Sequence, residues 1–429
     1  MIRLVRRHYW HLSFMGSCAF ALIGVTSVLW QSAAEDKGKI VIDEKNRDQI
    51  RLTPEQQAIA DKIARSPETV NLSVMSLSVQ TRGAQDGYSR IYLPLAGGKE
   101  VALVRTQPTV KTERGFTWRG EVEGTGERAV LMLWDDGHLS GFFGHEGRVF
   151  MVSHAGGEIH TMSELDPGKL PPDHAPASQS NLASGASRSA RPEPSVTQFA
   201  EANRLALEAK SITIDIMLLY TKNAANRYIG DPADLLELAI EQANDTFRNS
   251  ALGNIKLRLV HTEGIDYDES DEDQFTHLYR LVDGEGVFKK VRKLRDEKRA
   301  DVVGLVLHSP TGCGLSTRIG ADTDEAFFVV HHACAAITYS LAHEVGHILG
   351  TRHDRAVDAN DTPFPYAHGY VNGNKWRDMM SYREGCDGCP RIPFWSNPRV
   401  LYRGEPTGTA ASDNARVILE QAERVSNFR

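Results

Sequence analysis

The stretch HEVGHILGTRHD, from His343 to Asp354, constrains the fold more than any other part of the chain. In a helix of 3.6 residues per turn, His343 and His347 lie one turn apart and project from the same face. Two imidazoles on one face can occupy adjacent corners of a zinc tetrahedron. Gly350 can end the helix in a left-handed turn, so that His353 returns as a third ligand. Three protein ligands leave one position for water, as in catalytic zinc sites.

Glu344 lies roughly 100° round the same helix from His343, near the metal position without having to bind it. This placement suits a base that acts on a water molecule beside the metal. The full pattern H-E-x-x-H-x-x-G-x-x-H fixes five positions, so a chance match in this chain is on the order of one in ten thousand. The sequence therefore favours zinc-dependent hydrolysis over a helix with incidental histidines.

Strands and helices alternate in the part of the chain that leads to this motif. Asp231 is a favourable helix cap, and Pro232 suits the first helical position. The alternation predicts an α/β (α+β) domain with a mainly parallel, twisted sheet and an active-site helix. Residues 326–334 are expected to form an edge strand before that helix. Strands are expected at 212–220, 254–262 and 300–308, and helices at 231–250 and 286–299.

Residues 35–166 are expected to form a first domain that is mostly β. Thr53 and Pro54 favour a helix start, and apolar runs separated by DDG and GHEG predict a meander of antiparallel strands. The scattered histidines of this part are interpreted as ordinary surface or turn residues; they are His138, His145, His154 and His160. Residues 167–205, rich in Pro, Ser, Ala and Gly, predict a flexible linker open to proteolytic processing, which leaves 206–429 as the second domain.

The first 34 residues have the layout of a secretory signal. Basic residues precede an uncharged run from Leu12 to Trp30, and the small residues Ser32 and Ala34 follow. We expect removal of residues 1–34 and a secreted protein, extracellular or periplasmic, without stable membrane association. An uncleaved membrane anchor is the alternative, since the run is just long enough to span a bilayer.

Apart from Cys18, the chain has four cysteines, an even number that indicates disulfides in an exported domain. The pairs Cys313–Cys334 and Cys386–Cys389 are favoured because each closes a local loop. A four-thiolate zinc site is the rival, but the spacing fits it badly.

The formal net charge of -7 argues against a nucleic-acid partner. The acidic run Asp266–Asp273 lacks the ligand spacing of a known calcium loop, so a solvated loop is favoured and calcium binding stays open. His331 and His332 are expected at an edge or in a cleft, and the same holds for His368, because the motif already supplies three histidines.

The zinc motif resembles that of the metzincin endopeptidases, whose signature pairs this helix with a downstream methionine turn. The stretch RDMMSYREG supplies such a turn, and Asp354 after the third histidine resembles the reprolysin (adamalysin-like) branch. Residues 391–418 resemble bacterial peptidyl-Asp metalloendopeptidase-like members of that branch. The resemblance covers about half of the chain, from Ser211 onward.

The resemblance implies a role for each matching residue. His343, His347 and His353 would bind one catalytic Zn²⁺, and Glu344 would be the general base. Met380 matches the turn methionine, whose thioether would form an apolar floor beneath the histidines.

Two departures from the family pattern follow. Tyr382 stands where adamalysin-like enzymes have proline, and a tyrosine there can bind zinc and stabilise the oxyanion in other metzincins. No cysteine lies between Cys18 and Cys313, so a zinc-binding thiolate cannot keep the enzyme latent once the signal is removed. The first domain is implied to be a propeptide that inhibits the enzyme by other means.

These features predict a secreted zinc endopeptidase made as a zymogen, acting on protein or peptide substrates held along an exposed edge strand. Arg383 and Arg391 follow the methionine turn, and Arg352 lies within the zinc motif; an arginine in the specificity pocket would favour an acidic side chain. The alternatives are a non-catalytic zinc-binding interaction protein on the same scaffold and a membrane-tethered protease. The intact Glu344 argues against the first of these.

Overall fold

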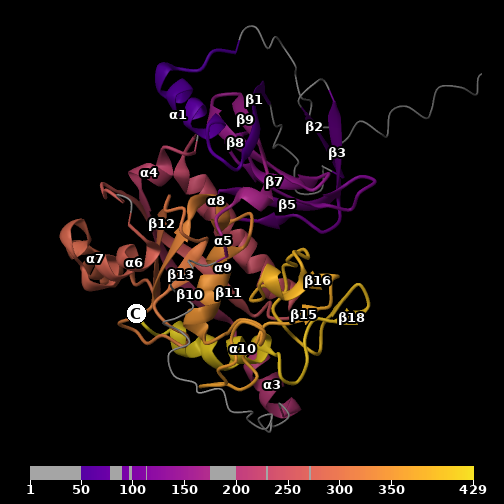
Figure 1. Cartoon of the computed structure of the whole chain (residues 1–429), viewed down its shortest axis with the longest axis vertical. Helices are drawn as coiled ribbons and strands as arrows, with labels where there is room; N and C mark the ends of the chain where they lie inside the picture. Colours follow the sequence, from indigo (N-terminus) through magenta and orange to yellow (C-terminus); the bar gives the residue numbers. More distant parts are fainter. Residues whose placement is uncertain are drawn as a thin grey trace, which may run out of the picture.

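The computed structural model describes residues 50–77, 89–95, 99–112, 114–173, 200–228, 230–269 and 272–429. They form an N-terminal unit, up to residue 173, that packs on a larger C-terminal unit, from residue 200 onward (Figure 1). The signal expected at 1–34 and most of the linker expected at 167–205 lie outside the described residues. Within the described ranges, no helix has the length and apolar character needed to cross a lipid bilayer.

The N-terminal unit consists of a helix and an antiparallel sheet. Helix α1 (Pro54–Ala64) begins at a capping box, in which Thr53 and Gln56 each accept a hydrogen bond from the other's backbone N–H. The nine-stranded sheet has the order β1-β9-β8-β7-β6-β5-β3-β2, with β4 paired to β5. The strands are β1 (Thr69–Ser76), β2 (Arg90–Pro94), β3 (Glu100–Arg105), β4 (Val110–Lys111), β5 (Gly115–Val122), β6 (Arg128–Trp134), β7 (Leu139–His145), β8 (Arg148–Gly156) and β9 (Ile159–Leu165), followed by the short helix η3 (Pro167–Lys169).

Strand β6 is buried on both faces and joins the two units. Leu131 and Leu133 belong to a core within the N-terminal unit. Val130, Met132 and Trp134 alternate with them and belong to the main core of the C-terminal unit. Because successive side chains of a strand point to opposite faces, the C-terminal unit covers one face of the N-terminal sheet.

The C-terminal unit is built on a five-stranded sheet of order β11-β10-β12-β14-β13. Its first four strands are parallel, and β13 is antiparallel to β14. Helices α5 and α9 pack in the core on one face, and α6 and α7 pack in the core on the other. The strands are β10 (Ile212–Thr221), β11 (Ile255–Ile265), β12 (Val302–Leu307), β13 (Gly314–Ser316) and β14 (Phe327–His331). The helices are α3 (Glu201–Glu208), α4 (Lys222–Ala225), α5 (Pro232–Asn249), α6 (Gln274–Asp283), η4 (Gly286–Lys290), α7 (Val291–Lys298), α8 (His332–Ala335) and α9 (Ser340–Leu349).

The prediction of an edge strand at residues 326–334 is wrong. Strand β14 is paired on both sides, with β12 and with β13, and all of its residues are buried. The edge strand on this side of the sheet is β13, whose three residues are too short a run to predict a strand from sequence.

After α9 the chain has little regular structure until its last helix. The elements are β15 (Val371–Asn372), β16 (Trp376–Arg377), η5 (Arg383–Cys386), β17 (Leu401–Tyr402), β18 (Glu405–Pro406) and α10 (Asn414–Val425). The favoured disulfides are confirmed: Cys313 is bonded to Cys334, and Cys386 to Cys389. The first links the residue before β13 to α8, close to the start of α9.

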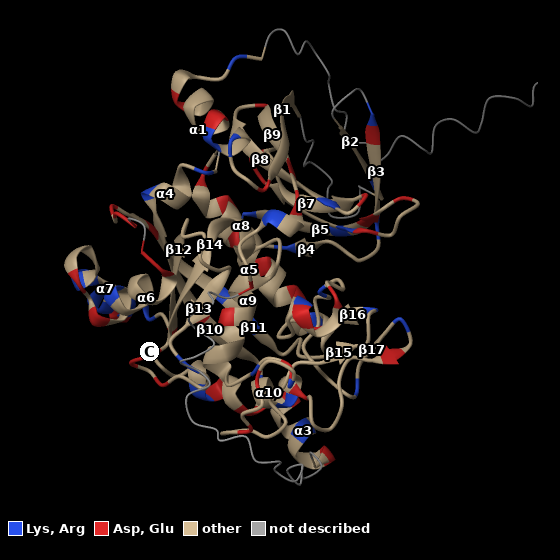
Figure 2. Cartoon of the chain, viewed as in Figure 1, with Lys and Arg blue, Asp and Glu red and all other residues tan. Residues whose placement is uncertain are grey.

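The interface between the units pairs bases of the N-terminal sheet with acids of α5 (Figure 2). Nε of Arg119 lies 2.6 Å from Oδ1 of Asp245, and both side chains are almost fully buried. Further pairs join Arg114 to Asp234 and Glu237, Arg119 to Glu241, Arg128 to Asp245, and His138 to Asp234. The α5 acids recur at intervals of three or four residues, so they form one stripe along the helix.

His138 and His160 are buried, so the interpretation of them as surface residues is wrong, although His138 does lie in the turn between β6 and β7. His138 is 6% exposed and its Nε2 lies 3.1 Å from Oδ2 of Asp234, while His160 is fully buried. Helix α5 covers His138 through Asp234, and the sequence of the sheet alone does not contain this contact. His160 is held within the sheet, where its Nε2 accepts the backbone N–H of Leu139 at 3.1 Å. His145 and His154 are half-buried.

Candidate active site

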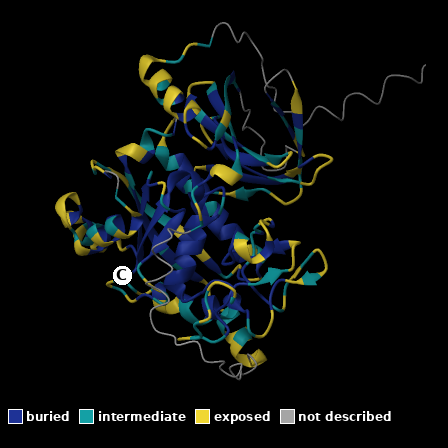
Figure 3. Ribbon diagram, in the orientation of Figure 1, coloured by how far each residue is buried: buried dark blue, intermediate teal, exposed yellow. Residues whose placement is uncertain are grey.

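Helix α9 carries the zinc motif through the centre of the C-terminal unit. All of its residues are buried, so the motif side chains act in surroundings from which bulk water is largely excluded (Figure 3). Gly350 ends the helix in the left-handed region at φ 108°, a backbone conformation that glycine adopts without strain. The chain reverses there and brings His353 back toward the helix.

The three histidines of the motif converge. Nε2 of His343 lies 3.2 Å from Nε2 of His353. The ring of His347 stands 4.8 Å from that of His343 and 4.6 Å from that of His353, measured between centroids. Each ring offers a nitrogen, and these nitrogens all lie within 4.8 Å of one another.

Backbone carbonyls fix which nitrogen faces the centre. Nδ1 of His343 lies 2.9 Å from the carbonyl oxygen of Met379, and Nδ1 of His347 lies 2.9 Å from that of Thr351. A carbonyl oxygen only accepts, so each Nδ1 carries its hydrogen and each Nε2 presents a lone pair. Burial lowers the pKa of His347 to about 4, which keeps this imidazole neutral. A set of neutral imidazoles held in this way fits a zinc ion.

Glu344 lies beside these histidines and is held by strand β13. The hydroxyl of Ser316 donates to Oε2 of Glu344 at 2.6 Å. Burial raises the pKa of Glu344 to about 8, while the hydrogen bond from Ser316 and the charge of Arg391 act in the opposite direction. A cation held by the histidines would favour the ionised carboxylate.

The methionine turn is tied to the loop of the third histidine. Met379 and Met380 are both fully buried in the main core. Asp354 accepts the backbone N–H of Tyr382 at 3.0 Å. This bond joins the residue after His353 to the residue two after Met380, so Asp354 acts as a brace between the two loops.

The hydroxyl of Tyr382 reaches the centre of the site. It lies 3.0 Å from Nε2 of His353, and the tyrosine is 3% exposed. From this position it could bind a metal or donate a hydrogen bond to an oxygen atom next to the metal.

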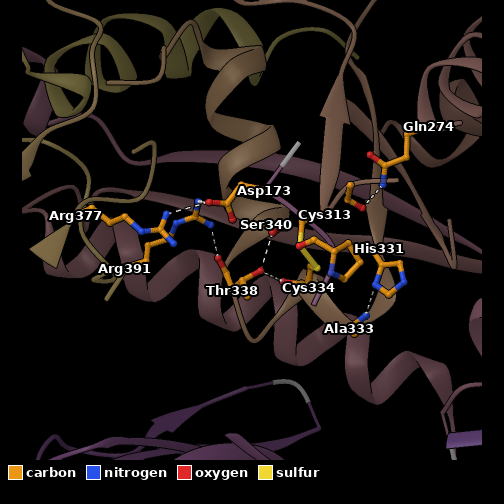
Figure 4. The surroundings of a disulfide bond; sticks show 12 residues. Asp173, Gln274, Cys313, His331, Ala333, Cys334, Thr338, Ser340, Arg377 and Arg391 are labelled. Atoms are coloured by element: carbon orange, nitrogen blue, oxygen red, sulfur yellow. Dashed lines mark hydrogen bonds and ion pairs between the residues drawn. A yellow bond between two sulfur atoms is a disulfide. The ribbon is translucent and has the colours of Figure 1, made fainter. Parts of the chain in front are cut away.

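The arginines of the region occupy different environments. The side chain of Arg391 is only 7% exposed and donates to the carbonyl oxygen of Thr338, just before α9. Arg377, which sequence reasoning missed, lies beside it and donates to the carbonyl oxygen of Ser381 at 2.6 Å. Both contact the carboxylate of Asp173 (Figure 4). Arg383 is partly exposed on η5.

Arg352 instead makes contacts within the loop after the zinc motif. Its Nε lies 2.9 Å from Asp358, and Nη1 donates to the carbonyl oxygen of Thr362. These contacts brace the loop after the zinc motif. Sequence reasoning missed Arg377 because it precedes the methionine turn, and no sequence pattern marks that position.

Other histidines near the motif make local hydrogen bonds. Nδ1 of His331 accepts the backbone N–H of Ala333 and caps α8. His332 is paired with His308 through Nε2 and Nδ1 at 3.0 Å. Nδ1 of His368 donates to the carbonyl oxygen of His353 at 2.9 Å, which supports the loop of the third histidine.

The acidic run Asp266–Asp273 is only partly a solvated loop. Glu269 is 3% exposed and accepts the backbone N–H of His308 at 2.8 Å, while Asp273 caps α6. Residues 270 and 271 lie outside the described residues.

The family model and the curated relatives that match this chain indicate one class, the metallopeptidases. A model of metallo-peptidase family M12 matches residues 210–396. The peptidyl-Asp metalloendopeptidase of Xanthomonas campestris pv. campestris is 29% identical over 386 residues, 86% of this chain and 88% of the relative. That of Stenotrophomonas maltophilia (strain R551-3) is 30% identical over 356 residues, 77% of this chain and 81% of the relative. Among solved structures, metalloproteinase-II from Bacteroides fragilis is 12% identical and covers 77% of this chain and 90% of its own, with a TM-score of 0.38.

Proposed function

This chain is a zinc metalloendopeptidase that belongs to metallo-peptidase family M12, and from that premise we propose which residues carry the reaction. His343, His347 and His353 hold the zinc ion, and Glu344 is the general base. The observation that carries this assignment is the pair of Nδ1 contacts, 2.9 Å each, that turn Nε2 of His343 and His347 toward a common point beside Glu344.

Different residues of the site carry out different steps of peptide hydrolysis. Zinc, when bound, supplies a Lewis acid that polarises the scissile carbonyl and a water molecule. Glu344 takes the proton from the attacking water and passes it to the leaving amine nitrogen. Ser316 keeps the Glu344 carboxylate in place through its 2.6 Å hydrogen bond. The Tyr382 hydroxyl donates to the oxyanion as charge develops there.

The test compares the purified protein with Glu344→Gln on an unbiased peptide mixture, with zinc measured in both. We expect equal zinc content, and a rate about 100 to 10,000 times lower in the variant, the range for loss of a general base. Zinc in both with no cleavage by either, even after cutting within 174–199, would favour the non-catalytic binding protein.

We further propose a preference for acidic residues next to the cleaved bond. The relatives named peptidyl-Asp metalloendopeptidase support it. A second support is the pair of buried arginines, Arg377 and Arg391, because buried guanidinium groups bind carboxylates well. The cut sites in the peptide mixture test the preference: Arg391→Ala should lose it, while Arg383→Ala, altered on the partly exposed η5, should keep it.

The proposal includes secretion as a zymogen. Residues 1–34 would be the signal, 35–166 the propeptide and 167–205 the linker that is cut. The signal layout and the two disulfides support export. Sequencing the N-terminus of the exported protein before and after activation tests both cuts, because a membrane-tethered protein would retain residues 1–34.

A further inference from the structure

We infer that residues Leu170–Asp173 are an inhibitory, substrate-like plug, with the carboxylate of Asp173 in the place that an acidic substrate side chain would take. The inference rests on the proposed acidic preference and names how the same site is regulated. It assigns the latency of the precursor to four residues at the end of the N-terminal unit.

The side chain of Asp173 is held by both buried arginines. Its Oδ2 lies 3.2 Å from Nη1 of Arg377 and 3.1 Å from Nη2 of Arg391. The three side chains are only 6–7% exposed. Ion pairs that are shielded from water in this way are screened little by salt.

The pocket itself is rigid and needs an anion. The carbonyl oxygen of Ser381 accepts from both arginines, at 2.6 Å from Arg377 and 3.3 Å from Arg391, and that of Thr338 accepts from Arg391. These bonds fix the two guanidinium groups side by side. Burial and the charge of Arg391 lower the pKa of Arg377 to about 9, although Asp173 acts in the opposite direction. Two buried cations without a partner are costly, so a carboxylate is the natural occupant.

The backbone before Asp173 runs against the edge of the catalytic sheet. The backbone N–H of Cys313 donates to the carbonyl oxygen of Pro172 at 2.8 Å. Cys313 directly precedes β13, the edge strand, and extended peptides bind at such edges through main-chain hydrogen bonds. Leu170 is buried against Cys313, Ala333 and Cys334.

Two prolines make the plug stiff. Pro171 and Pro172 have a fixed φ, so the segment loses little conformational entropy when it binds. Neither has an N–H, so neither can donate to the edge strand as an ordinary substrate residue would.

The plug lies next to the reacting groups. Arg391 donates to the carbonyl oxygen of Thr338, two residues before α9, the helix that carries Glu344. Gly314, the residue after Cys313, is in contact with Glu344: a Cβ built on it would lie 2.5 Å from Oε1. A segment bound to both Cys313 and Arg391 therefore covers the approach to the base. Figure 4 shows Asp173, the two arginines and the disulfide in one view.

The first experiment measures cleavage of an acidic reporter peptide by full-length, uncut protein. Asp173→Ala should raise this rate about 10- to 100-fold, the effect of losing a hydrogen bond to a charged group. Lys169→Ala, a charge change at an exposed position of the same segment, is the matched control and should stay latent. An Asp173→Ala precursor as latent as the wild type would overturn the inference.

A second experiment tests the inference separately from a folding defect of Asp173→Ala and from a failure of the proposed function. In full-length protein carrying Asp173→Ala and Glu344→Gln, calorimetry compares binding of capped Leu-Pro-Pro-Asp and Leu-Pro-Pro-Asn peptides. Tighter binding of the Asp peptide, by about tenfold or more, is expected whether or not the protein cleaves anything. Equal binding would overturn the plug, while loss of cleavage by the cut wild-type protein would overturn only the proposed function.

Discussion

Gly314 of the edge strand and Glu344 of the motif helix are in direct contact, and a Cβ on Gly314 would lie 2.5 Å from Oε1 of Glu344. No real Cβ approaches an oxygen that closely, so Gly314→Ala must displace the carboxylate. We expect kcat to fall about 100-fold, with KM nearly unchanged, because a misplacement of about 1 Å costs this much. Steady-state kinetics measure the effect. Gly253→Ala is the control, since a Cβ there meets nothing within 4 Å; an unchanged kcat in Gly314→Ala would contradict the contact.

The Tyr382→Phe variant tests whether the hydroxyl of Tyr382 takes part in catalysis or whether its ring only packs. The hydroxyl lies 3.0 Å from Nε2 of His353, and removal of one oxyanion donor costs about 100-fold in kcat. We expect that loss with KM and zinc content retained. Tyr366→Phe, which removes a hydroxyl bonded to Glu420, should leave kcat unchanged. Wild-type kcat in Tyr382→Phe would show that the ring only packs.

Arg119→Ala should weaken the attachment of the N-terminal sheet to α5. The variant leaves Asp245 buried with only part of its ion-pair network, and breaking a buried pair costs about 3 kcal/mol. Urea unfolding of the full-length protein measures the loss. Lys111→Ala removes an exposed pair with Asp135 and should cost no more than about 1 kcal/mol. Equal effects of both substitutions would show that the buried network does not stabilise the interface.

The same interface should depend on pH through His138. Burial lowers the pKa of His138, but Asp234 of α5 and Asp136 of its own turn together raise it above the usual value; His154 stacks on the same ring. Since the folded pKa is raised, the stabilisation is complete below the unfolded pKa of about 6.5 and is lost as the pH rises through the folded value.

His138→Gln should therefore lower the unfolding temperature more at pH 5.5 than at pH 8.5. Thermal unfolding of the full-length protein at both pH values measures the difference. His145→Gln, altered away from the α5 contacts, is the control. A loss of stability that is the same at both pH values would mean that the charge of His138 contributes nothing.

The sequence correctly predicted features that depend only on neighbouring residues, such as helix caps. Asp231 caps α5 with Pro232 at its first position, as the sequence indicated. Gly350 has the left-handed conformation that its place in the motif requires. Each of these features depends on residues only a few positions apart, so a single sequence contains the whole cause.

The features that were missed depend on segments far apart in the chain. Arg377 and Asp173 form an ion pair because the end of the N-terminal unit folds onto the C-terminal unit. The sequence around each shows only a turn and a proline-rich stretch. The sequence does not show that β14 is an inner strand, because its neighbour β13 has only three residues. His138 is an interface residue because α5 covers this part of the sheet.

The alternation along β6 has a consequence if the N-terminal unit is cut away, as we propose. Val130, Met132 and Trp134 share one core with Leu235 and Leu238 of α5. Release of the N-terminal unit therefore turns part of an interior into a water-facing apolar surface. Without the N-terminal unit, the enzyme should aggregate more readily and be less soluble than its precursor. It should also refold poorly by itself, because the unit that packs against this face of α5 is absent.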